Sequence, residues 1–62
     1  MKMSEAFYDE LAKGFARQVC DGEKTLLQIE RILSKHGWNK FMLEQMMQRI
    51  RDKISERKKG NG

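Results

Sequence analysis

The heptapeptide Ser34–Lys40 (SKHGWNK) joins a helix stop directly to a helix start, and it constrains the fold more than any other stretch of the chain. Gly37 is the expected left-handed residue after a helix, and Trp38 can fold back onto Leu33, the apolar contact that accompanies a Schellman turn. Asn39 is a favoured N-cap for a helix that begins at the next position. The sequence therefore predicts a tight corner between two helices, with little room for a flexible linker.

The residues on both sides of this corner are helix formers. The 62 residues include no proline, and Leu, Met, Lys, Glu, Gln and Arg dominate, which lose least on entering a helix. Ser4 is expected to cap a first helix, and Thr25 with Gln28 has the spacing of a capping box that opens a second. We predict an all-α fold, a compact three-helix bundle with helices over about 4–20, 25–36 and 39–58. A single domain over 1–59 would precede a disordered tail at 60–62.

Each predicted helix has one apolar face at a spacing of 100° per residue. Together the three faces can close one small core. Leu27 and Phe41 fall outside these faces, whereas His36 projects on the inner side and is expected to be a packed residue at a helix end. The apolar faces comprise Phe7, Tyr8, Leu11, Ala12, Phe15, Ala16 and Val19 in the first helix, Leu26, Ile29, Ile32 and Leu33 in the second, and Met42, Leu43, Met46, Met47, Ile50 and Ile54 in the third.

The small size of the domain limits its stability. A folded domain of this length buries only about 60% of the surface that its unfolded chain exposes. Cys20 is the only cysteine, which excludes an internal disulfide. Well-formed helix packing or a second copy of the chain must then supply the remaining stability, so a homodimer is an open alternative.

Several classes of function lack the residues that they need. One His and one Cys are too few for a zinc site, and there is no Gly-rich phosphate loop. Ser34 and His36 are two residues apart on a helix, so they point in different directions and do not form a nucleophile–base pair. We therefore expect no enzymatic activity, no cofactor, no metal and no small-molecule substrate.

The same composition bears on location. No apolar run approaches the roughly 20 residues that span a bilayer, and the amino end lacks the basic-then-apolar layout of a signal peptide. The unpaired Cys20 fits a reducing compartment. We expect a cytoplasmic protein without membrane contact. Chains of this length are often encoded by phages or mobile elements.

The charge of the chain is concentrated in its last third. The formal net charge is +4, and residues 39–62 hold seven Lys and Arg against three Asp and Glu, which accounts for the whole excess. Such a gradient suits an acidic protein surface or a nucleic-acid backbone, and it equally suits cations at a helix carboxyl end.

The first functional hypothesis is a small regulatory or inhibitory protein that docks on another protein, or on itself, through its basic, Met-rich third helix. Unbranched Met side chains suit a surface that must fit a partner, and basic residues could steer an acidic partner. A Met stripe at helical spacing is also typical of plain core. The predicted interface residues are Trp38, Phe41, Met42, Met46, Arg49 and Lys53.

The alternative hypothesis is a DNA-binding transcriptional regulator. The pattern around Gly37 partly resembles a helix-turn-helix motif, whose second helix enters the major groove. It departs from that motif at Leu33 and His36, and Glu44 would repel phosphate, so protein docking is favoured. The predicted DNA-contacting residues are Asn39, Lys40, Gln45, Gln48, Arg49, Arg51 and Lys53.

Overall fold

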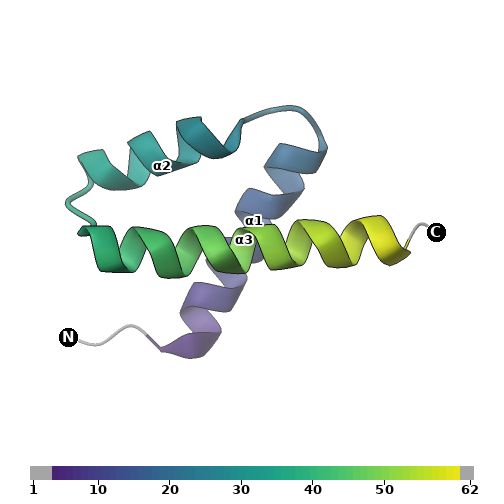
Figure 1. Cartoon of the computed structure of the whole chain (residues 1–62), viewed down its shortest axis with the longest axis horizontal. Coiled ribbons are helices and arrows are strands. Elements are labelled where there is room, and N and C mark those ends of the chain that lie inside the picture. The colour runs from purple at the N-terminus through teal and green to yellow at the C-terminus, as the bar shows by residue number, and fades with distance from the viewer. Residues whose placement is uncertain (1–3, 61–62) are drawn as a thin grey trace.

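The computed structural model describes residues 4–60, and side chains through residue 58, as three helices joined by two short turns (Figure 1). Helix α1 spans Glu5–Cys20, α2 spans Leu26–Lys35 and α3 spans Lys40–Gly60. The predicted all-α, three-helix fold is confirmed. The first two helices differ from the predicted ranges only by the cap residues that those ranges included, whereas α3 ends at Gly60, two residues beyond its predicted end and at the first residue of the predicted disordered tail. The first residues of the predicted domain, 1–3, and residues 61–62 of the predicted tail lie outside the described part of the chain.

All three helix starts are capped by side chains, as the sequence predicts. The Ser4 hydroxyl accepts the backbone N–H three residues on at 3.2 Å, and the Asn39 side-chain oxygen does the same for α3 at 2.8 Å. At α2, Gln28 Oε1 accepts the Thr25 N–H at 2.9 Å and Thr25 Oγ1 accepts the Gln28 N–H at 3.1 Å, which completes the capping box. Each cap satisfies an amide group that the helix leaves without a partner.

Two Schellman turns end the first two helices. Gly37 has a φ of +87°, and the Trp38 N–H donates to the Leu33 carbonyl at 3.1 Å, as predicted. Gly22, with a φ of +79°, ends α1 in the same way, since the Glu23 N–H donates to the carbonyl five residues earlier at 2.9 Å. The sequence indicated that α1 ends here but did not specify this second turn.

His36 departs from its predicted place. It caps the carboxyl end of α2, and its backbone N–H bonds to carbonyls of the last helical turn. Its side chain is exposed, whereas the sequence placed it on the packed inner face. The reason is that His36 is the C-cap of α2, where the chain leaves the helix and enters the turn at Gly37.

The three helices form two layers. Figure 1 shows α2 lying beside α3 and running in nearly the opposite direction, while α1 crosses behind α3. The Cα atoms extend 38 × 22 × 14 Å along the three principal axes. The shortest extent, 14 Å, matches the roughly 13–15 Å that two packed helices span between their outermost Cα atoms, so the molecule is two helices thick. Helix α3 packs more extensively on α1 than on α2. No helix within residues 4–60 is long and apolar enough to cross a membrane.

The core lies where α1 crosses α3 and where α2 meets both. Ala12 and Ala16 have almost no exposed surface, and such small side chains let two helix axes approach closely. Met46 and Met47 are also buried, so this part of the Met stripe is core. The buried residues of the cluster are Ala12, Ala16, Ile29, Leu33, Met46, Met47 and Ile50.

Two glycine replacements should change stability in opposite directions. Gly14 lies inside α1, and a Cβ built there meets no atom within 4 Å. Gly14→Ala is therefore expected to raise the free energy of unfolding by about 0.5–1 kcal/mol. Gly37→Ala should lower it by about 1–2 kcal/mol because a Cβ is strained at positive φ. Urea denaturation followed by circular dichroism measures both, and a loss of stability in Gly14→Ala would contradict the open environment of this residue.

Candidate functional site

The side chains of α3 form two stripes that face different neighbours. Met46 and Ile50 lie in the core, and Arg49 and Lys53 contact carboxylates of α1. The second stripe faces α2 and lines a groove between the two helices. Its spacing of three, one, three, one and three residues keeps it on one side of the helix. The α3 residues of this stripe are Lys40, Leu43, Glu44, Met47, Gln48 and Arg51.

The first stripe is already engaged within the chain. The Arg49 guanidinium donates to the Glu5 carboxylate at 3.4 Å and lies 5.6 Å from the centre of the Tyr8 ring. Tyr8 also packs edge-to-face with Trp38, with 6.0 Å between ring centres. These contacts fix the amino-terminal half of α1 against the corner and the middle of α3.

A second ion pair joins the same two helices. Lys53 Nζ lies 3.0 Å from Asp9 Oδ1. The bond from Lys53 lowers the pKa of Asp9 below its ordinary value of 3.8; partial burial opposes this shift, and nearby cations add to it. The same bond raises the pKa of Lys53 above 10.5. Both groups therefore stay charged across the physiological range, and their charges are neutralised locally.

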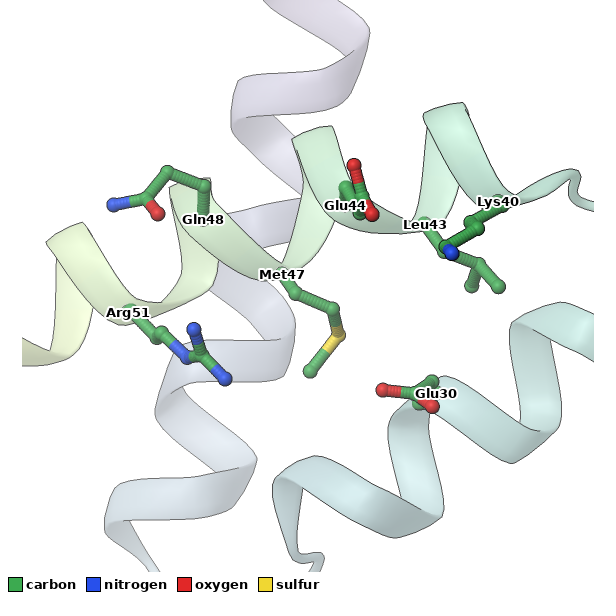
Figure 2. Close-up of a pocket in the computed structure, with 7 residues that line it drawn as sticks. All are labelled: Glu30, Lys40, Leu43, Glu44, Met47, Gln48 and Arg51. Atoms are coloured by element: carbon green, nitrogen blue, oxygen red, sulfur yellow. The ribbon is translucent and has the colours of Figure 1, made fainter.

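The α2–α3 groove is a pocket of about 430 Å³ lined by the second stripe together with Glu30 of α2 (Figure 2). Leu43 and Met47 supply its apolar floor, and Met47 points toward α2. Charged and amide side chains form its rim. Within residues 4–58, the four charged groups that line the groove form no ion pair with one another or with other groups. These four are Glu30, Lys40, Glu44 and Arg51.

Two exposed apolar side chains lie on α2 and α3 outside the lining of the groove. Phe41 is 69% exposed and Leu27 is 62% exposed. Phe41 precedes Glu44 by three residues, and Leu27 precedes Glu30 by three, so each lies on the same side of its helix as a groove residue. We call the groove with Phe41 and Leu27 the α2–α3 face.

The predicted protein-interface residues do not form one exposed surface. Phe41 is exposed, and Trp38 and Met42 are half-buried. Met46 is wholly buried in the core of the folded chain and presents no surface to a partner. The remaining two, Arg49 and Lys53, are paired with α1. The common reason is that α1 crosses over this stripe of α3.

The predicted DNA-contacting residues are also divided. Lys40, Gln48 and Arg51 meet in the α2–α3 groove. Asn39 caps α3, and Gln45 is exposed outside the groove. The other two members of that set, Arg49 and Lys53, are those that pair with α1.

Groove residues that sequence reasoning did not select are Glu30, Leu43, Glu44 and Met47. Their 3–4 spacing is readable in the sequence. What could not be read is which of the two α3 stripes α1 would cover, because both stripes hold apolar and basic residues.

Among the described residues, no group of three or more His, Cys, Asp and Glu side chains is placed to hold a metal ion. Comparisons of the chain with protein-family models, curated proteins and solved structures find no match. The inference of function therefore rests on the geometry of the α2–α3 face.

The Asp9–Lys53 pair should make stability depend on pH in a defined direction. Because the pKa of Asp9 is lowered on folding, the stability that its carboxylate contributes is present above its ordinary pKa of 3.8 and is lost as the pH falls through the lower folded value. Asp9→Asn should therefore reduce the melting temperature at pH 7 and have little effect at pH 2.

Thermal unfolding from pH 7 to pH 2, followed by circular dichroism, measures this difference. Glu10→Gln is the matched control, since the Glu10–Lys13 pair is exposed and longer, at 3.8 Å. A deficit of Asp9→Asn that is equally large at pH 2 would contradict the assignment.

Proposed function

We propose that this chain is a small non-enzymatic regulatory or inhibitory protein that docks on another protein through α3 and the adjoining α2–α3 face. The observation that carries the proposal is the position of Phe41 and Leu27. They are the two most exposed of the large apolar side chains described, and each lies three residues before a residue that lines the groove. Exposed apolar surface bordered by polar groups is typical of protein interaction sites.

The composition of the face supports the same proposal. An aromatic residue beside a concave apolar floor suits the anchor-and-pocket arrangement that dominates interface energies. Met47 lines that floor, and Met side chains adapt to partners of different shape. Exposed Arg57 and Lys58 extend the basic character along α3 beyond the groove, and they would steer acidic groups of a partner toward the carboxyl end of this helix.

DNA binding stays the alternative proposal, and it is supported by the charge of the last third. Two features weigh against it. Helices of a helix-turn-helix motif meet at about 90–120°, whereas α2 and α3 lie side by side and nearly antiparallel in Figure 1. Arg49 and Lys53, two of the basic residues that would meet phosphates, are paired with α1 carboxylates.

Replacing the exposed apolar residues should abolish docking while leaving the fold intact. The double variant Phe41→Ser, Leu27→Ser is expected to change the free energy of unfolding by less than about 1 kcal/mol, because both side chains are exposed. Affinity capture from the host lysate should lose its protein partner with this variant.

Phe7→Ser is the matched control, because Phe7 is 48% exposed but lies on α1, away from the groove. It should retain the partner. Collapse of the fold in the double variant would show that these residues are core, and equal capture by both variants would show that docking does not use this face.

A nuclease arm separates the two proposals. Capture that survives nuclease supports a protein partner. Capture that requires nucleic acid, with a mobility shift of random duplex DNA that weakens steeply as salt increases, would instead support the DNA-binding alternative.

A further inference from the structure

The rim of the α2–α3 groove carries both signs of charge in balance. Glu30 and Glu44 are acidic, and Lys40 and Arg51 are basic. Within residues 4–58 none of them is paired. By contrast the Arg49 and Lys53 cations of the other α3 stripe are matched by α1 carboxylates. The groove therefore presents unpaired charges of both signs beside exposed apolar side chains.

This local balance matters because the chain as a whole is charged. With a formal net charge of +4, two copies repel one another in most orientations. The α2–α3 face is a place where a second copy can approach without meeting an excess of like charge. A strongly acidic partner would leave Glu30 and Glu44 facing its own carboxylates, which is unfavourable.

The register of α3 makes the face complementary to itself. Glu44 and Arg51 are seven residues apart, about two helical turns, and lie on one stripe. Two α3 helices that run antiparallel about a two-fold axis beside Met47 and Gln48 place each Glu44 opposite the second copy's Arg51. Lys40 then lies opposite the neutral Ser55, so no like charges of this stripe meet.

We propose that the α2–α3 groove is occupied by a second copy of this chain, in a symmetric antiparallel dimer held by two Glu44–Arg51 pairs, one on each side of the two-fold axis. The dimer rests on the proposed function, because it takes the same face to be the docking surface. It also covers the side of α2 and α3 that faces away from α1, to which the described helices add no further layer (Figure 1).

Charge reversal tests this arrangement by analytical ultracentrifugation of the full chain across a hundredfold range of concentration. The wild type should dimerise. Glu44→Lys and Arg51→Glu should each raise the dissociation constant about tenfold or more, because each brings like charges together twice. The double variant Glu44→Lys, Arg51→Glu should restore dimerisation, since both pairs re-form with their signs exchanged.

Mixing the two single variants gives the sharpest result. In the mixed dimer, the Lys introduced by Glu44→Lys in one chain lies opposite the Glu introduced by Arg51→Glu in the other. The second pair joins the unchanged Arg51 of the first chain to the unchanged Glu44 of the second. A heterodimer should therefore form from two chains that each associate poorly alone. Glu23→Lys and Arg31→Glu are controls with the same charge changes outside the groove, and they should dimerise more like the wild type. Melts by circular dichroism establish that all variants are folded.

A monomeric wild type, or single variants that dimerise as well as their controls, would overturn the dimer, and so would a double variant that fails to recover. This failure is distinct from failure of the proposed function. If the chain is monomeric but still captures a protein through Phe41 and Leu27, the proposed docking function holds and only a second copy of the chain is excluded as the partner.

Discussion

The close crossing of α1 over α3 is the contact on which the rest of this structure depends. Ala12 and Ala16 bring the two helices together, and Met46 and Ile50 belong to the same buried cluster. Small side chains on one helix and long ones on the other fill such a crossing without a void. The contact fixes the rotation of α3 about its own axis, and so determines which α3 side chains are buried and which are presented.

The electrostatics of the molecule follow from this rotation. With Met46 turned toward α1, Arg49 and Lys53 come within reach of Glu5 and Asp9. The basic excess of the last third is thus partly neutralised on one side of α3. On the side that faces α2, acidic and basic groups alternate around an apolar floor without pairing in the described residues. One helix consequently has a stripe that is paired within the chain and a second stripe whose charged groups have no ion-pair partner in residues 4–58.

Much of the fold could be predicted because its signals are local. The caps at Ser4, Thr25 and Asn39, and the turn at Gly37, act through hydrogen bonds between residues a few positions apart. Their residue types and spacing are read directly from the chain. The candidate site was predicted less well. Phe41 was predicted to lie outside the apolar stripe of its helix and is exposed, whereas Met46, which was also predicted for the interface, is buried in the core.

The sequence by itself determined three helices, their ends and the tight corner at Gly37, since backbone hydrogen bonding and side-chain caps are short-range. It also determined that Phe41 lies outside the apolar stripe of its helix. Only the tertiary structure decided that α1 covers the first stripe of α3, which contains Met46. The second stripe, which contains Met47, is left to line the groove with α2. The physical reason is that both stripes have similar composition, so the choice depends on how closely Ala12 and Ala16 allow α1 to pack, which is a property of three helices together.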